Sequence, residues 1–258
     1  MVFDRRPILT ELQDKYAVRR YVTERIGEHI LPTLHWVTKD PADIPFDDLP
    51  DRFVVKATHG SHWVYLVPDK ARLNRQDLIE KCTSWLGWNY YRRCREWAYK
   101  HIEPRIMVEE FLNDNTGLVP LDYKFYVFSG RAHMIQVEAE RFVGPLSKYD
   151  CYGRTWDRLD IDVAPRRERI ERLPRPKHLD EMIECAEALG DGLNFLRVDL
   201  YDAGKVFFGE ITVYPCAGLT INGPDAWNRY LGSLWEMPFR RRTGVNVLEP
   251  TDGDPSSS

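Results

Sequence analysis

The stretch RVDLYDAGKVFFGEITVYP, residues 197–215, decides the fold. Two runs of β-forming residues flank the polar turn DAGK, residues 202–205, and this pattern predicts a β-hairpin. Each run carries one acid among apolar residues, Asp199 in the first and Glu210 in the second. A carboxylate on a buried strand is costly unless it is paired or binds a cation. Two such carboxylates on paired strands indicate a cation between them, and oxygen ligands of this kind suit Mg²⁺, which usually arrives with substrate phosphates.

The direction of the polar side chains depends on the turn. Alternation places Arg197 and Asp199 on one face of their strand, and Glu210 and Thr212 on one face of the other. With an even number of loop residues and no bulge, all four point the same way, whereas a one-residue bulge puts Glu210 on the opposite face. The hairpin taken alone fits a solvent-facing polar row on an antiparallel sheet equally well.

The composition excludes several classes of protein. The chain has 258 residues, enough for one large domain or about two to three small subdomains. Its formal net charge of −4 is too mild to indicate nucleic acid or an anionic membrane as a partner. No apolar run approaches the roughly 20 residues of a membrane span, and the N-terminus lacks the apolar segment of a signal peptide. We therefore expect a cytoplasmic protein without stable membrane insertion and without a nucleic-acid partner.

The five cysteines are odd in number and show no CxxC spacing. This argues against a disulfide framework and a structural zinc site, so reduced, mostly buried thiols are expected.

Strands, hairpins and helices alternate irregularly along the chain, which predicts an α+β fold with mixed or antiparallel sheets. The expected strands are 30–37, 53–57, 63–67, 106–112, 122–128 and 133–138, in addition to the hairpin above. The expected helices are 15–26, capped by Asp14, then 75–100, 179–189 and 225–235. Residues 40–51 and 154–177 are expected to be irregular.

A candidate phosphate site follows the strand at 53–57. Lys56 stands just before a polar turn that contains His59, Gly60 and Ser61, and backbone N–H groups of such a turn can help a lysine to hold phosphates. The alternative for Lys56 is an edge-strand lysine that discourages aggregation. The HxxH of this turn has no third ligand, which argues against zinc. The chain contains neither the Walker nor the Rossmann phosphate motif.

Three further places carry candidate side chains. Lys15 begins a predicted helix, where the helix dipole does not favour a cation, so it either meets an anionic ligand or is solvated. Residues 109–112, EEFL, end a strand at a polar turn and either bind a nucleoside or are simply exposed. Asp122 and Lys124 share one strand face, as an ion pair or as a contact to substrate or γ-phosphate. Arg141 follows the partner strand and can join the same pocket.

These pieces follow one another in the order found in ATP-grasp enzymes, and the chain most resembles the TupA-like branch, which is common among polysaccharide-biosynthesis proteins. The resemblance covers residues from about 8 to 235. The stretches that carry it are DKYAVR (14–19), KATHGS (56–61), NYY (89–91), REW (95–97), PRI (104–106), DYKF (122–125), VDLY (198–201) and GEITVYP (209–215).

The resemblance implies an ATP-grasp fold, in which two α+β subdomains clamp ATP and Mg²⁺. It implies a short N-terminal segment at 1–50, a lid subdomain at 51–115, a C-terminal subdomain with the metal site at 116–248, and a tail at 249–258 that we expect to be disordered. Only about 50 residues precede Lys56, so the usual N-terminal substrate domain is short or absent.

The resemblance also implies roles for the candidate residues. Its nucleotide site comprises Lys15, Lys56, the turn residues His59, Gly60 and Ser61, Glu109 or Glu110 near the ribose, the main chain of Phe111 and Leu112 at the adenine, and Asp122. Asp199 and Glu210 would hold Mg²⁺, with Thr212 where most ATP-grasp enzymes have a metal-binding Asn. Arg197 would stabilise the transferring phosphoryl group or a later oxyanion, while Lys124 and Arg141 would face the substrate.

The function implied is an ATP- and Mg²⁺-dependent carboxylate–amine ligase that acts through an acyl phosphate. Its partners would be a small or polymeric carboxylate and an amine such as an amino acid or amino sugar, in the biosynthesis of a polymer, polysaccharide or peptide-like metabolite. The alternatives are a phosphotransferase acting on a sugar or alcohol hydroxyl, and a non-catalytic nucleotide-binding protein of a polysaccharide assembly system.

Overall fold

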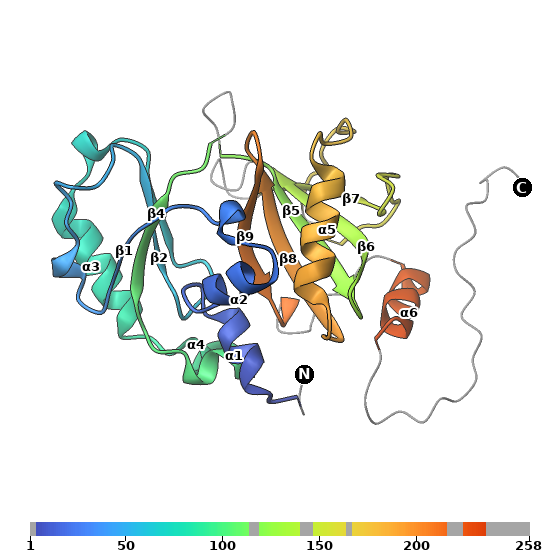
Figure 1. Cartoon of the computed structure of the whole chain (residues 1–258), viewed down its shortest axis with the longest axis horizontal. Coiled ribbons are helices and arrows are strands. Elements are labelled where there is room, and N and C mark those ends of the chain that lie inside the picture. The colour runs from blue at the N-terminus through green and yellow to red at the C-terminus, as the bar shows by residue number, and fades with distance from the viewer. Residues whose placement is uncertain (1–3, 114–118, 140–146, 164–166, 216–223, 236–258) are drawn as a thin grey trace, which may run out of the picture.

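Two antiparallel sheets stand side by side in the computed structural model, each with helices packed against it (Figure 1). The structure describes residues 4–113, 119–139, 147–163, 167–215 and 224–235. The first sheet has the order β1-β4-β2-β3 and the second the order β7-β6-β5-β8-β9. The first consists of β1 (Leu34–Thr38), β2 (Phe53–Ala57), β3 (Val64–Val67) and β4 (Ile106–Glu110). The second consists of β5 (Asp122–Phe128), β6 (Arg131–Ala139), β7 (Lys148–Tyr152), β8 (Phe195–Asp202) and β9 (Val206–Thr212). The predicted α+β class is confirmed.

The first sheet buries one face against helix α3 (Arg75–Leu86). Alternation along β2 sends Phe53, Val55 and Ala57 into this core, where they meet side chains of α3 such as Leu78. The residues between them, Val54 and Lys56, therefore point to the other face, and both line a cavity between the sheets.

The second sheet buries one face against α5 (Leu179–Gly190), α1 (Pro7–Gln13) and α2 (Val18–Arg25). The apolar stripe of α5 enters this core with the alternate residues of β5 and β8, while α1 and α2 add Leu12 and Val22. Because α1 and α2 pack on the second sheet and β1 pairs within the first, residues 7–38 contribute to both sheets.

Helix limits differ from the prediction at two places. The segment predicted as one helix at 15–26 is α2 alone, and Asp14 accepts hydrogen bonds from the N–H groups of Tyr16 and Ala17 in a turn before it. The segment predicted at 75–100 is broken into α3, α4 (Tyr90–Cys94) and the 3-10 helix η4 (Trp97–His101). Asn89 caps α4, and Arg95 ends it with a φ of 58°. The Asn89 cap and the left-handed conformation of Arg95 thus interrupt the segment in which the aromatic pattern favoured one continuous helix.

The remaining short elements are η1 (Glu28–Ile30), η2 (Pro41–Asp43), η3 (Lys70–Arg72) and α6 (Asp225–Ser233). The predicted strand at 30–37 therefore begins later, at Leu34. None of the helices in the described ranges has the length and apolar character needed to cross a membrane.

The β8–β9 hairpin reaches its register by two compensating irregularities. Asp202 pairs with Val206, so the loop between the strands contains three residues, 203–205. With this odd number and no bulge, Asp199 would lie opposite Gly209. A bulge at Gly209 adds one residue to β9, so Asp199 pairs with Glu210 and Arg197 with Thr212. All four side chains therefore share one face, although the simple condition of an even loop without a bulge is not met.

Gly209 is where this register is most sensitive to substitution. A Cβ there would lie 2.9 Å from the carbonyl oxygen of Asp199 and 2.8 Å from the ring of Tyr201. We expect Gly209→Ala to lower the free energy of unfolding by about 1–3 kcal/mol, as overpacking of a tight site does. Equilibrium unfolding in urea measures this change.

Gly232→Ala is the matched control, because a Cβ at Gly232 meets nothing within 4 Å and the position lies in helix α6. We expect this variant to be neutral or slightly stabilising. Equal stability of the two variants would contradict the steric role of Gly209.

Candidate active site

A cavity of about 680 Å³ lies between the two sheets, within the size range of small-molecule sites. Of the residues predicted for a nucleotide, metal or substrate site, those that line it are Lys15, Lys56, Ser61, Glu110, Phe111, Leu112, Lys124, Arg197, Glu210 and Thr212. The predicted residues His59, Gly60, Glu109, Asp122 and Asp199 are not among its lining residues. Arg141 lies outside the described residues. A larger hollow of about 1250 Å³ borders α1 and α2 and is lined by neither Lys56 nor Glu210.

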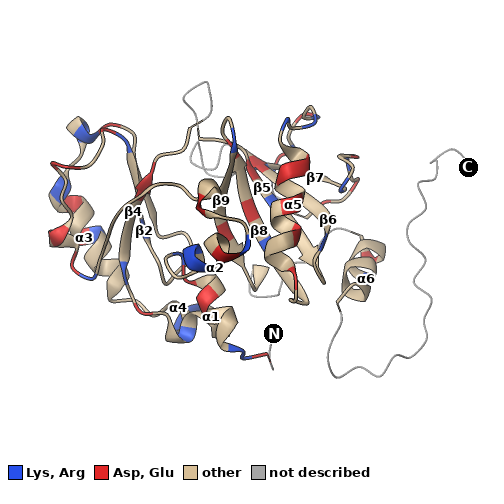
Figure 2. Cartoon of the chain, viewed as in Figure 1, with Lys and Arg blue, Asp and Glu red and all other residues tan. Residues whose placement is uncertain are grey.

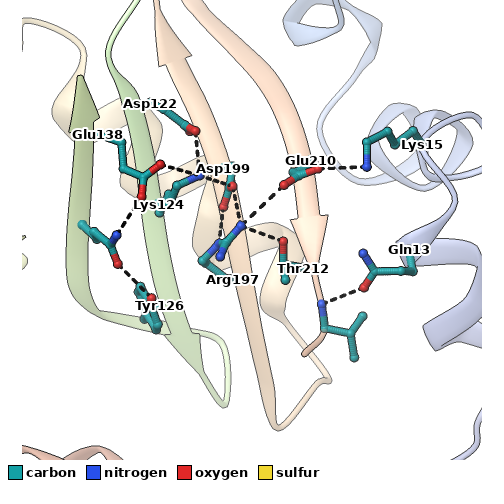
Figure 3. Close-up of polar contacts among 12 residues, drawn as sticks. Gln13, Lys15, Asp122, Lys124, Tyr126, Glu138, Arg197, Asp199, Glu210 and Thr212 are labelled. Atoms are coloured by element: carbon teal, nitrogen blue, oxygen red, sulfur yellow. Dashed lines mark hydrogen bonds and ion pairs between the residues drawn. The ribbon is translucent and has the colours of Figure 1, made fainter. Parts of the chain in front are cut away.

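One row of polar residues crosses four strands of the second sheet. Register places Gln136 on β6 beside Lys124 on β5, Lys124 beside Asp199 on β8, and Asp199 beside Glu210 on β9. Directly paired residues project from the same face, so the strand pairing itself brings Lys124, Asp199 and Glu210 together on one face of the sheet (Figure 3).

Asp199 is buried and is held by two cations. Arg197 binds it with both prongs of the guanidinium, Nε 2.7 Å from Oδ1 and Nη2 2.7 Å from Oδ2. Lys124 Nζ lies 2.7 Å from Asp199 Oδ2 and 2.6 Å from Asp122 Oδ2. Only 1% of Asp199 and none of Asp122 is exposed, and buried carboxylates are stable as anions only with such partners.

Glu210 lies at the cavity surface between Lys15 and Arg197. Its Oε2 is 3.0 Å from Lys15 Nζ, and its Oε1 is 3.5 Å from Arg197 Nη2. Burial acts to raise the pKa of Glu210, but Lys15, Arg197 and Lys124 together hold this pKa well below its usual range. Glu210 is therefore an anion throughout the physiological pH range. The Thr212 hydroxyl accepts a hydrogen bond of 2.9 Å from Arg197 Nη2.

The oxygen donors of this row fit Mg²⁺ only in part. Asp199 and Glu210 are paired across two strands, and Thr212 is the next side chain on the same face. In the part of the chain that the structure describes, no group of three or more His, Cys, Asp or Glu could hold a metal ion. Since Mg²⁺ keeps several waters and takes one or two carboxylates together with substrate phosphates, this donor set fits an ion that arrives with a nucleotide.

Lys56 and Glu109 meet across the first sheet. Lys56 Nζ lies 2.7 Å from Glu109 Oε2, and Arg19 Nη1 lies 2.8 Å from Glu109 Oε1. Both oxygens of this buried carboxylate are thus occupied by cations. Glu110 is different: Oε2 accepts hydrogen bonds of 3.0 Å from the N–H and the hydroxyl of Thr33, and the residue borders the cavity. Glu110 is therefore better placed than Glu109 to meet a ligand.

The turn after β2 holds its shape through Gly60. A Cβ at this position would lie 2.3 Å from the ring of Trp63, so only glycine lets Trp63 pack there. The Gly60 carbonyl accepts a hydrogen bond of 3.0 Å from Lys15 Nζ. His59 is buried, with Nε2 3.0 Å from the Trp85 carbonyl, and its side chain points into the α3 side of the sheet rather than the cavity.

The cavity also has an apolar wall. Val54 and Leu66 from the first sheet lie in it with Phe111 and Leu112, and Tyr201 comes from the second sheet. A wall of this kind fits a planar ring with apolar faces, such as a purine. The guanidinium carbon of Arg52 lies 4.5 Å from the centroid of the Phe111 ring, a cation–π contact.

Sequence reasoning missed several polar residues of the cavity. Arg167 Nη1 lies 2.8 Å from Glu138 Oε1, and Gln136 bridges Glu138 and the hydroxyl of Tyr126 at 3.0 Å each. Gln136 and Glu138 alternate along a predicted strand, which was a usable signal. Arg167 stands in the irregular segment 154–177, where no periodicity marks it.

Glu96 is a further missed residue of the cavity. Burial raises the pKa of Glu96 to about 7. The charge of Glu210 also raises this pKa, whereas the charges of Arg197 and Lys15 lower it. It belongs to the REW stretch quoted above, which did not show which way its carboxylate would point.

Comparison with known proteins is informative at the family level. A family model described as TupA-like ATP-grasp matches residues 1–236. No curated protein matches the chain. Among solved structures, D-alanine–D-alanine ligase from Bacillus anthracis is 17% identical with a TM-score of 0.48, over 83% of this chain and 62% of that one. The chain thus spans less than two thirds of the length of that ligase.

Two further solved structures are similar. The ATP-grasp ligase PsnB, complexed with a minimal precursor, Mg and ADP, is 13% identical with a TM-score of 0.44, over 89% of this chain and 61% of that one. L-amino acid ligase from Bacillus licheniformis is 18% identical with a TM-score of 0.43, over 78% of this chain and 40% of that one.

The first prediction from this site concerns Lys124. Lys124→Met leaves Asp122 and Asp199 buried without one of their cations, and we expect it to lower the free energy of unfolding by about 3 kcal/mol or more. Urea unfolding measures the loss. Lys39→Met, which removes an exposed ion pair with Glu103, is the control and should cost less than about 1 kcal/mol. Similar losses in the two variants would contradict the buried network.

The second prediction concerns Glu96 and pH. Its pKa is raised from 4.5 to about 7, so the folded state binds a proton more tightly than the unfolded state. Its contribution to stability is therefore fully present below pH 4.5 and is lost as the pH rises to about 7. As the pH rises across this interval, we expect the melting temperature of Glu96→Gln to increase relative to that of the wild type. A constant difference between the two melting curves would show that Glu96 titrates normally.

Proposed function

The chain belongs to the TupA-like ATP-grasp family, and we propose that it is an ATP- and Mg²⁺-dependent carboxylate–amine ligase. The observation that carries this proposal is the row of Lys124, Asp199 and Glu210 with Arg197 at the inter-sheet cavity. Ion pairs with a purely structural role need no cavity beside them. This row borders a cavity of about 680 Å³ that has one apolar wall. In this proposal residues 51–115 form the lid and residues 116–248 carry the metal site.

The nucleotide would lie with its base against Phe111 and Leu112 and its phosphates toward Lys56 and Lys15. Both lysines are cavity residues, and each is now paired with a carboxylate, Glu109 and Glu210 respectively. Phosphate oxygens can replace these carboxylates as partners of the lysines. Glu210 would then be released from Lys15.

Asp199 and Glu210 would hold Mg²⁺, which when bound neutralises charge on the phosphates. Arg197 would turn from Asp199 toward the transferring phosphoryl group, since it already spans Asp199, Glu210 and Thr212. Lys124 would keep Asp199 and Asp122 compensated during this exchange. These residues thus act by positioning and by charge stabilisation, without a covalent enzyme intermediate.

The reaction has two bond exchanges. A carboxylate oxygen of the substrate attacks the γ-phosphorus, and the bond from that phosphorus to ADP breaks, leaving an acyl phosphate. The nitrogen of an amine, with a free electron pair, then attacks the acyl carbon, and the C–O bond breaks as phosphate leaves and nitrogen loses a proton. An enzyme that uses ATP in this way would act in the cytoplasm, and we propose an amino acid or an amino sugar as its acceptor.

The experiment incubates the protein with ATP, Mg²⁺ and panels of carboxylic acids, amino acids and amino sugars, and identifies the nucleotide and the product mass. The ligase predicts ADP, free phosphate and a new amide. ADP with a phosphorylated acceptor would indicate a phosphotransferase. ATP binding without turnover would indicate a non-catalytic protein, and AMP would exclude the acyl-phosphate route.

Glu210→Gln tests the metal site directly. It keeps the size of the side chain but removes the charge that faces Lys15 and Arg197, and we expect ATP turnover to fall by about 100-fold or more. Glu24→Gln, at an exposed position on α2, should retain wild-type turnover. Undiminished turnover in Glu210→Gln would refute the assignment of the metal site.

A further inference from the structure

Among the described carboxylates that line the cavity, Glu96 differs in having no polar partner for its side chain. It immediately precedes η4 and is half-buried. Glu138 and Glu210 each form an ion pair and Glu110 accepts hydrogen bonds from Thr33, whereas within the described ranges no hydrogen bond or ion pair reaches the Glu96 carboxylate. A carboxylate that is partly withdrawn from water and left without a partner can accept a cation from a ligand.

The surroundings of Glu96 suit an ammonium group. Tyr90, Tyr99 and Tyr214 line the same cavity, and Glu96 is close enough to act on the pKa of each hydroxyl. A carboxylate beside aromatic side chains binds an ammonium through charge and through the ring faces. The burial that raises the pKa of Glu96 to about 7 is a cost that a bound cation would offset.

Glu96 also lies beside the proposed reacting centre. The charges of Arg197, Glu210 and Lys15 all act on it, and all three residues line the cavity with it. An ammonium at Glu96 would therefore place its nitrogen next to the residues proposed to hold the transferring phosphoryl group.

We propose that Glu96 binds the ammonium group of the acceptor substrate, an inference that rests on the ligase function proposed above. It makes the acceptor a primary amine that enters the site as a cation, which fits amino acids and amino sugars and excludes amides and alcohols. Glu96 positions this group and takes no part in formation of the acyl phosphate. Before attack the ammonium passes one proton to the Glu96 carboxylate, which frees the electron pair of the nitrogen. As the C–N bond forms, the C–O bond to phosphate breaks and the nitrogen gives its second proton to the leaving phosphate.

The test compares two acceptors that differ in charge. Wild-type protein, Glu96→Gln and Glu24→Gln receive ATP, Mg²⁺ and a carboxylic acid that supports turnover. The acceptor is either hydroxylamine, which is small and uncharged at mildly alkaline pH, or a cationic amino acid or amino sugar that the wild type uses. Hydroxylamine traps the acyl phosphate as a hydroxamate and needs no ammonium site, so it reports the first step alone.

We expect Glu96→Gln to form hydroxamate within about twofold of the wild-type rate, while the KM for the cationic amine rises about tenfold to 100-fold, as loss of a charge-assisted hydrogen bond does. Glu96→Asp should recover part of this loss, and Glu24→Gln should match the wild type with both acceptors. Hydroxamate formation in the variant also shows that it is folded.

Two results would overturn the inference while the ligase stands. Equal loss with both acceptors would show that Glu96 serves the metal, the nucleotide or the fold, and unchanged use of the cationic amine would show that it has no part in binding. If the wild type forms neither hydroxamate nor amide with any acid, the ligase proposal itself fails and the inference falls with it.

Discussion

The alignment of Asp199 with Glu210 is the constraint on which the rest of the structure depends. Two anions on adjacent strands repel each other, and one of them is almost fully buried. They can coexist only if cations reach both, and these come from three separate parts of the chain: Arg197 on β8, Lys124 on β5 and Lys15 ahead of α2. Acidic and basic residues are visible together along the inner strands of the second sheet (Figure 2).

The third of these cations also connects the two sheets. Lys15 donates to the Gly60 carbonyl in the first-sheet turn and pairs with Glu210 on the second sheet, and its own N–H donates to the Thr58 carbonyl at 3.2 Å. The charge of Glu210 is therefore compensated from a segment that is hydrogen-bonded to the turn after β2. In the proposed function, phosphates that take Lys15 would loosen this connection and free Glu210 at the same moment, so nucleotide entry would be linked to metal binding.

Much of the fold was predictable because its strands obey local rules. The strand at 53–57 and the hairpins at 122–138 and 197–212 alternate clearly, so their existence, and the presence of Asp199 and Glu210 on facing strands, followed from pattern alone. The features that the sequence did not predict depend on strand register or on tertiary packing. Neither the length of the three-residue loop nor the bulge at Gly209 can be recognised until the register of the hairpin is known. Arg19 and Thr33 meet Glu109 and Glu110 only through tertiary packing, since each is far in sequence from its partner. Glu96 also comes to the cavity only through tertiary packing.

Thr212 sets the proposed metal site apart from most ATP-grasp enzymes, which have an Asn at this position. An amide at this position would offer an oxygen to a cation, but it would also present N–H groups to Arg197, which has donors only. The Thr212 hydroxyl accepts from Arg197 with one lone pair and retains another, so it orients the guanidinium between Asp199 and Glu210. A hydroxyl is a weaker metal ligand than an amide oxygen, so in the proposed site Thr212 would orient Arg197 rather than coordinate a cation. Metal coordination would then rest on the two carboxylates and on phosphate oxygens, which makes binding of the ion dependent on the nucleotide.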